Sequence, residues 1–127
     1  MSESAKTALV IEDDENNMVL ITALLHKGGY EVLQAWTGEE GVSLCLGRRP
    51  DFVILDVQLP DTDGFEVLRQ LRASPRDGNL PIIAMTSYAM AGDRERLLAA
   101  GCTGYIEKPI DPTRVIDDIR RIIDDPQ

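Results

Sequence analysis

The stretch Phe52-Val53-Ile54-Leu55-Asp56 is an uninterrupted apolar run that ends in a carboxylate. Comparable apolar runs stand at Leu9-Val10-Ile11, Val32 to Trp36, Ile82 to Met85 and Gly104 to Ile106. Strands that are apolar at successive positions are covered on both faces, which is typical of a parallel sheet with helices on each side. The run at 32–36 is partly amphipathic because of Gln34 and Trp36, which favours an edge strand. The alternation predicts a βα unit repeated five times.

Helix-period segments separate and follow these runs. The predicted helices cover about 15–27, about 38–46, from Gly64 to before Pro75, about 91–100 and about 114–124. The first is expected to end in a left-handed cap at Gly28-Gly29, and the fourth is expected to close at Gly101. The last presents one apolar stripe, formed by Val115, Ile116, Ile119, Ile122 and Ile123.

Length and composition limit the classes of function. With 127 residues and no linker or repeat, we expect one domain over 1–127 with its core at about 8–123. The 13 Lys and Arg residues against 22 Asp and Glu residues give a net charge of −9, which disfavours binding to nucleic acid or to an anionic membrane. No apolar stretch approaches the roughly 20 residues of a membrane span, and the N-terminus lacks the apolar core of a signal peptide, so we expect a cytoplasmic protein. Cys45 and Cys102 stand in no metal-binding or redox pattern and are expected to be buried apolar residues.

Acidic residues follow two of the predicted strands. Glu12-Asp13-Asp14 follows the first, and Asp56 and then Asp61 and Asp63 follow the third. The carboxyl ends of parallel strands meet in one crevice, where carboxylates repel one another unless a divalent cation binds them. Carboxylate oxygens suit Mg²⁺, which takes one or two carboxylates and keeps several waters.

An aspartate beside a metal ion and a lysine stays ionised and can attack phosphorus. Asp56 is the candidate nucleophile, and Lys108 and the hydroxyl of Thr86 are candidate donors to the phosphoryl oxygens.

Each of these residues also has a structural interpretation. Asp13 or Asp14 could cap the first helix and Asp63 the third. Thr86 could be a loop hydroxyl, Lys108 a solvated surface lysine and Tyr105 a packed strand residue with its hydroxyl at the rim. The joint pattern favours the functional interpretation, because an acidic pair, an Asp, a hydroxyl and a Lys-Pro follow strands one, three, four and five in order.

Four segments resemble a known family. They are LVIEDDENN (9–17), DFVILDVQLPDTDGFEVLRQLR (51–72), PIIAMTSYA (81–89) and GYIEKPI (104–110). Together they resemble the receiver domain of two-component response regulators, the CheY-like proteins, over about 8–123. The resemblance implies a flavodoxin-like (βα)5 three-layer sandwich with strand order 2-1-3-4-5, the order for which CheY is a standard example.

The resemblance implies roles for the acidic residues. Asp56 would be the phosphoacceptor, receiving its phosphoryl group from a sensor histidine kinase or a histidine phosphotransfer protein. Asp13 and Asp56 would bind Mg²⁺ directly, Glu12 would bind it through a water, and the backbone carbonyl of Gln58 would complete the protein ligands. Glu12 departs from the commonest pattern, which has Asp at this position.

The resemblance also implies a switch. Lys108 would hold a phosphoryl oxygen, with a cis peptide bond to Pro109. Thr86 would move toward the phosphoryl group and make room for Tyr105 to turn inward. The surface changed by this movement would be that of the fourth helix, the fifth strand and the fifth helix, where a downstream protein would bind, and the chain would be a monomer or a weak phosphorylation-dependent dimer.

Other functions remain possible at this point. The chain could be a stand-alone regulator of the cell-fate type or a receiver from a hybrid kinase. A haloacid-dehalogenase-type phosphohydrolase would carry a second Asp as its acid or base where Gln58 stands, so this class of enzyme is disfavoured. A flavin carrier would have a Ser/Thr/Gly-rich loop after the first strand, whereas this loop is acidic, so a flavin carrier is disfavoured too. A degenerate receiver is disfavoured by intact Asp13, Asp56, Thr86 and Lys108. We therefore expect that the protein is not an enzyme and catalyses only its own phosphorylation and dephosphorylation.

Overall fold

A computed structural model describes residues 6–59, 61, 63–73, 80–87 and 91–124. Its sheet consists of β1 (Thr7–Ile11), β2 (Glu31–Ala35), β3 (Phe52–Asp56), β4 (Ile82–Thr86) and β5 (Gly104–Glu107). All neighbouring strands are parallel, in the order β2-β1-β3-β4-β5. The predicted strand order and the edge position of β2 are confirmed.

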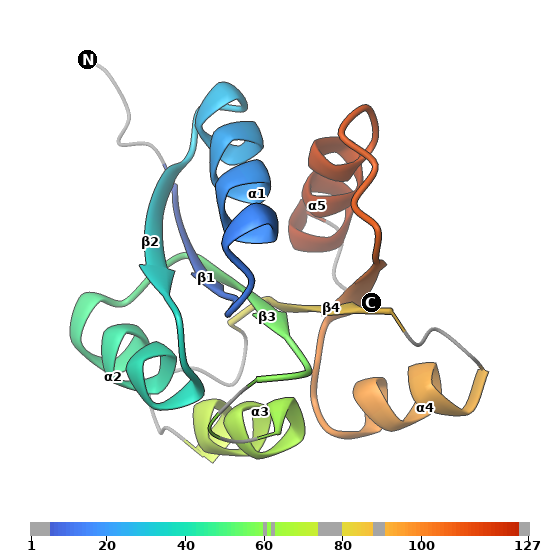
Figure 1. Cartoon of the computed structure of the whole chain (residues 1–127). Helices are drawn as coiled ribbons and strands as arrows, with labels where there is room; N and C mark the ends of the chain where they lie inside the picture. The colour runs from blue at the N-terminus through green and yellow to red at the C-terminus, as the bar shows by residue number, and fades with distance from the viewer. Residues whose placement is uncertain (1–5, 60, 62, 74–79, 88–90, 125–127) are drawn as a thin grey trace.

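Helices cover both faces of the sheet. They are α1 (Glu15–Lys27), α2 (Gly38–Arg48), α3 (Gly64–Ala73), α4 (Ala91–Ala99) and α5 (Val115–Asp124). Helices α1 and α5 lie on one face, and α2, α3 and α4 lie on the other (Figure 1). The predicted three-layer α/β sandwich is therefore confirmed.

The central strands divide their side chains between two hydrophobic clusters. In β1, Leu9 and Ile11 belong to the cluster under α2, α3 and α4, whereas Ala8 and Val10 belong to the cluster under α1 and α5. All four residues are completely buried. Because both faces are covered, the backbone that leads to the carboxyl ends of β1 and β3 is held rigidly.

Several element bounds differ from the predicted ones. Strand β1 begins at Thr7 because Thr7 pairs with Glu31 across the sheet, a non-local contact that the apolar run does not reveal. Helix α2 continues to Arg48, and Arg49 then adopts a left-handed conformation with φ 52°. The left-handed residue after α1 is Gly29, with φ 94°, while Gly28 keeps helical angles. Pro75, where α3 was predicted to stop, lies outside the described residues.

Side-chain patterns on the helices follow the sequence. On α5, Val115 and Ile119 are buried, and the other residues of the predicted stripe are partly buried. Cys45 and Cys102 are both free and buried, as expected. On α3, Val67, Leu68 and Leu71 are buried, and α3 also packs against α2.

The first residue of α3 packs directly against the chain that leaves β3. The amide of Gly64 donates to the carbonyl of Val57 at 3.0 Å. A Cβ added at Gly64 would lie 2.5 Å from the Cα of Val57, and a backbone atom cannot move aside as a flexible side chain can. Glycine at this position is therefore required by the close approach of two backbones.

We predict that Gly64→Ala lowers the free energy of unfolding by about 1–3 kcal/mol, the usual range for overpacking. Urea denaturation would measure the loss. Gly47→Ala is the matched control, since a Cβ at this exposed α2 position meets nothing within 4 Å and Ala is the better helix former. Equal stability of the two variants would contradict the steric argument.

Candidate functional site

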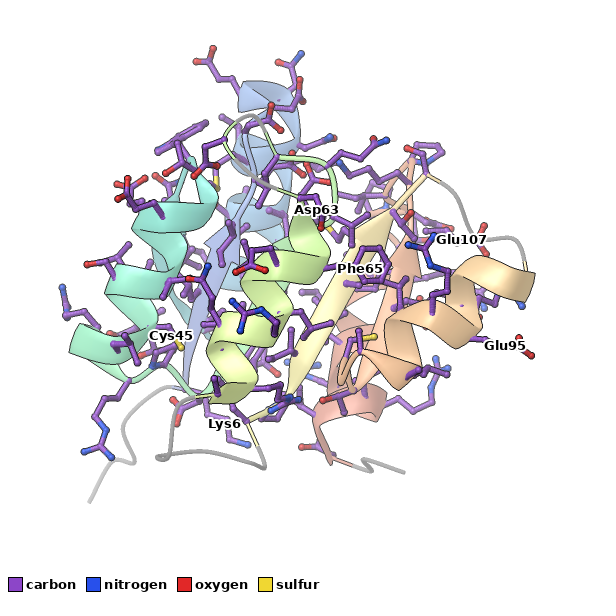
Figure 2. The ribbon with its side chains drawn as sticks, turned by 90° about the horizontal axis from the view of Figure 1, so that it is seen from below. Lys6, Cys45, Asp63, Phe65, Glu95 and Glu107 are labelled. Atoms are coloured by element: carbon purple, nitrogen blue, oxygen red, sulfur yellow. The ribbon has the colours of Figure 1, made fainter. Side chains whose placement is uncertain are left out.

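The candidate residues lie at one edge of the sheet. Glu12 and Asp13 directly follow β1, Asp56 ends β3, Thr86 ends β4, and Lys108 directly follows β5. Strands β1 and β3 are neighbours with Ile11 opposite Leu55, so the residues after them emerge side by side. In Figure 2 this edge is the one marked by Asp63 and Glu107, and Lys6 marks the opposite edge.

Glu12, Asp13 and Asp56 form an acidic cluster. One carboxylate oxygen from each lies within 4.8 Å of the others. Glu12 is 0 % exposed and Asp56 is 2 % exposed, while Asp13 lies at the surface. The structure thus brings together three of the residues predicted to bind a metal ion.

Lys108 provides the positive charge that faces this cluster. Its Nζ lies 3.2 Å from Oε2 of Glu12 and 3.3 Å from Oδ1 of Asp56. The lysine side chain is only 14 % exposed, so solvent screens these contacts weakly. Burial lowers the pKa of Lys108, but the charges of Asp56 and Glu12 outweigh burial, and the net shift of the pKa is upward. Lys108 therefore remains an ammonium group.

The cluster holds more negative charge than Lys108 balances. Burial, and then the neighbouring Asp56 carboxylate, raise the pKa of Glu12 to about 7. The pKa of Asp13 is also raised, first by burial and then by Asp56. Three carboxylates face one ammonium group, so full ionisation leaves an excess of two negative charges, the charge that one divalent cation neutralises.

The residues present fit such a cation. Oε2 of Glu12 is buried, and apart from its ion pair with Lys108 it accepts no well-formed hydrogen bond from the part of the chain that the structure describes. A buried carboxylate oxygen is costly without a partner. The ligand atoms that the cluster offers to a metal ion are all hard carboxylate oxygens, which Mg²⁺ prefers. The acidic cluster can therefore hold a metal ion.

Two further acidic residues near this edge, Asp14 and Asp63, cap helices. Asp14 is the N-cap of α1 and accepts from the amide of Asn17 at 2.8 Å. Asp63 accepts from the amide of Phe65 at 2.6 Å at the start of α3. For Asp14 and Asp63 the capping interpretation describes what the structure shows, since backbone amides occupy their carboxylates.

Asp61 has a role that the sequence did not indicate. Its carboxylate accepts from the amides of Gly38 and Glu39, the first residues of α2, at 2.8 Å and 3.0 Å. Backbone amides carry no residue signature, and 22 or more positions separate the partners. A sequence pattern could not have revealed this contact.

The remaining predicted residues surround Asp56. The amide of Gln58 donates to Oδ1 of Asp56 at 3.0 Å. Thr86 is buried at 3 % exposure, and its carbonyl accepts from the amide of Lys108 at 2.9 Å. The Lys108–Pro109 peptide bond, for which the resemblance implied a cis isomer, is cis.

Tyr105 is a residue of β5, and its ring contacts α4. It is half-buried against the cluster under α2, α3 and α4. The guanidinium of Arg94 lies 5.2 Å from the centroid of its ring, within the range of a cation–π contact. Arg96, two residues further along α4, stacks in the same way on Phe65 of α3 at 4.7 Å.

Residues 8–120 match the family of response regulator receiver domains. The chain belongs to this family. The receiver domain is 38 % identical over 120 residues to the polar-differentiation response regulator DivK of Brucella anthropi, covering 94 % of this chain and 98 % of the relative. DivK of Brucella ovis matches with the same identity and coverage.

Solved structures support the same assignment. The chemotaxis response regulator CheY4 of Vibrio cholerae superposes with a TM-score of 0.90 at 26 % identity, covering 94 % of this chain and 99 % of that one. The receiver domain of a sensor histidine kinase from Pseudomonas aeruginosa gives a TM-score of 0.86 at 33 % identity, over 95 % of this chain and 99 % of that one. That structure contains a magnesium ion coordinated in its active-site cleft. Among the described residues, no helix of this receiver is both long and apolar enough to span a membrane.

We predict that Asp13→Asn stabilises the metal-free receiver, because it removes a carboxylate whose ionised form is disfavoured beside Asp56. The sign follows from the raised pKa: the folded state favours the neutral form, and Asn is neutral at every pH. The midpoint of urea unfolding at pH 8 with a chelator present should increase. Asp14→Asn is the control and should change stability by less than about 0.5 kcal/mol, since Asn is an equally good N-cap. A lower midpoint for Asp13→Asn would contradict charge crowding in the cluster.

Proposed function

We propose that this receiver is a cytoplasmic, phosphorylation-dependent signalling switch in which Asp56 accepts a phosphoryl group from a phosphohistidine. The donor would be a sensor histidine kinase or a histidine phosphotransfer protein. The observation that supports this most strongly is the burial of Asp56 between the Lys108 ammonium and two further carboxylates at the open edge of the sheet. The chemistry is the same for a stand-alone regulator and for a module of a hybrid kinase.

In the proposed transfer, a carboxylate oxygen of Asp56 attacks phosphorus while the bond between phosphorus and the donor imidazole nitrogen breaks. The nitrogen leaves with the electron pair, and Asp56 becomes an acyl phosphate. Phosphoryl transfer passes through a loose transition state, so the protein needs chiefly to position the groups and to neutralise their charge. Lys108 is close enough to Asp56 to balance the negative charge on the phosphoryl oxygens, and the Thr86 hydroxyl would donate to one of them.

Bound Mg²⁺ would supply further positive charge at the phosphoryl oxygens. Asp13 and Asp56 would hold the ion directly, Glu12 through a water and Gln58 through its backbone carbonyl. Support comes from the cluster geometry and from the magnesium-bound receiver of Pseudomonas aeruginosa. The longer side chain of Glu12 suits the water-mediated role.

The proposed output surface is the α4–β5–α5 face, made of α4, β5 and α5. After phosphorylation Thr86 would move toward the phosphoryl group, and Tyr105 would turn into the space it leaves. A groove of about 680 Å³ already lies on this face, lined by residues that include Tyr105, Glu107, Arg114 and Asp118. Its mixed apolar and charged lining is suited to a protein partner.

We predict that Mg²⁺ binds at millimolar or lower concentration and shifts the amide resonances around Asp13 and Asp56 in NMR spectra. Asp13→Asn should weaken this binding at least tenfold, because a ligand carboxylate is lost. Asp14→Asn should retain wild-type affinity, since its carboxylate caps α1. Equal weakening by both variants would assign the effect to net charge, and an unchanged wild-type spectrum would contradict the metal site.

We predict that acetyl phosphate and Mg²⁺ add one phosphoryl group to the intact receiver, detected by mass spectrometry, and that Asp56→Asn abolishes the addition. Asp51→Asn is the matched control, because Asp51 precedes the same strand at its opposite end, where it accepts from the amide of Thr7. A persistent mass increase in Asp56→Asn would place the acceptor elsewhere. Multiple turnover of a generic phosphomonoester would instead support the phosphohydrolase alternative.

A further inference from the structure

The β3–α3 loop, of which the structure describes residues 57–59, 61 and 63, connects the phosphoacceptor strand to α3 and is closed at its base. The amide of Gly64 donates to the carbonyl of Val57, and Gln58 pairs with Asp63 as an isolated antiparallel bridge. At the same point the amide of Gln58 donates to Oδ1 of Asp56. The base of the loop is therefore part of the site.

Asp61 connects this loop to a different helix. Both oxygens of its carboxylate are used, one by the amide of Gly38 and the other by the amide of Glu39. These two hydrogen bonds hold the pKa of Asp61 below its usual range, so the carboxylate is charged at neutral pH. Charge-assisted hydrogen bonds of this kind are stronger than neutral ones, and two of them fix an orientation as well as a position.

Helix α2 has an N-cap of its own and does not depend on Asp61 for one. The Oγ1 of Thr37 accepts from the amide of Glu40 at 3.1 Å. The start of α2 is also packed closely on the sheet. Its backbone at Gly41 lies so near the side chain of Ile11, the last residue of β1, that a Cβ added at Gly41 would have no room. The contact thus joins a loop to an anchored helix, and the loop is the part that it can restrain.

We propose that Asp61 is a positioning residue of the phosphorylation site: by joining the β3–α3 loop to the start of α2, it holds the Gln58 peptide against Asp56. The Gln58 amide would then stay hydrogen-bonded to Asp56, and the carbonyl of the same residue would be restrained beside the acidic cluster. The effect of this restraint on metal binding and phosphorylation rests on the proposed function. The restraint on the Gln58 peptide can be tested without it.

The test compares Asp61→Ala with two control variants at the same helix start. Thr37→Ala removes the N-cap of α2 and leaves the Asp61 contact intact. Glu39→Gln removes one negative charge while keeping the backbone amide that Asp61 accepts from. Amide hydrogen exchange of Gln58 in the metal-free protein and the Mg²⁺ affinity are measured for each variant.

We expect Asp61→Ala to speed exchange of the Gln58 amide and to weaken Mg²⁺ binding by about tenfold, the lower end of the cost of losing an outer-shell partner. Both controls should match wild type in both measurements. Unchanged Gln58 exchange in Asp61→Ala overturns the proposal. An equal effect of Glu39→Gln would show that charge is responsible, and an equal effect of Thr37→Ala would show that fraying of α2 is responsible; either result also overturns it.

Failure of the proposed function would look different. If the wild-type receiver neither bound Mg²⁺ nor accepted a phosphoryl group, the proposed function would be wrong. Faster Gln58 exchange in Asp61→Ala alone would still show that Asp61 positions the peptide.

Discussion

The site depends on the adjacency of β1 and β3, which places Glu12 and Asp56 side by side in a buried position. Negative charges on the two carboxylates repel each other where water is excluded, so burial and the neighbouring Asp56 raise the pKa of Glu12, and a single lysine faces both groups. The arrangement persists because residues 8–11 of β1 and 52–56 of β3 are buried between helical layers, so the two strands cannot separate to relieve the repulsion. The rigidity of the core is thus what maintains an electrostatically unfavourable, and chemically useful, cluster.

Capping interactions surround this edge of the sheet and serve two purposes. Asp14, Thr37 and Asp63 satisfy amides at the starts of α1, α2 and α3, and the same residues fix the directions in which the chain leaves the strands. Asp61 accepts from the amides of Gly38 and Glu39 at the start of α2, which are distant from it in the sequence. Carboxylates that look alike in the sequence therefore divide into those that satisfy amides at a helix start and those that gather in the acidic cluster, which can hold a metal ion.

The side of the site formed by β4 and β5 is built differently. The hydrogen bond between the Thr86 carbonyl and the Lys108 amide joins the two strand ends directly. Tyr105 stands three residues before Lys108 and contacts Arg94 of α4 through its ring. In the proposed switch, a displacement of Thr86 or Lys108 would be passed to α4 through these few contacts.

Much of the fold was predictable because its causes are local. The apolar, largely β-branched runs 52–55 and 82–85 favour buried strands, and the spacing of Val115, Ile119 and Ile122 favours an amphipathic helix. The convergence of Glu12, Asp13, Asp56, Thr86 and Lys108 followed from the geometry of parallel strands once the strand order was taken from the family resemblance. Local pattern alone does not give that order.

By itself, then, the sequence determined which segments are strands and helices and which side chains stand at the strand ends. These features could be predicted because the spacing of apolar residues and the capping of helices depend on only a few neighbouring positions. The tertiary structure alone decided that Asp61 binds the start of α2, that Arg94 stacks on Tyr105 and that α2 runs to Arg48. These outcomes depend on backbone amides, ring faces and packing partners brought together from distant parts of the chain. Such partners have no signature in the order of the residues.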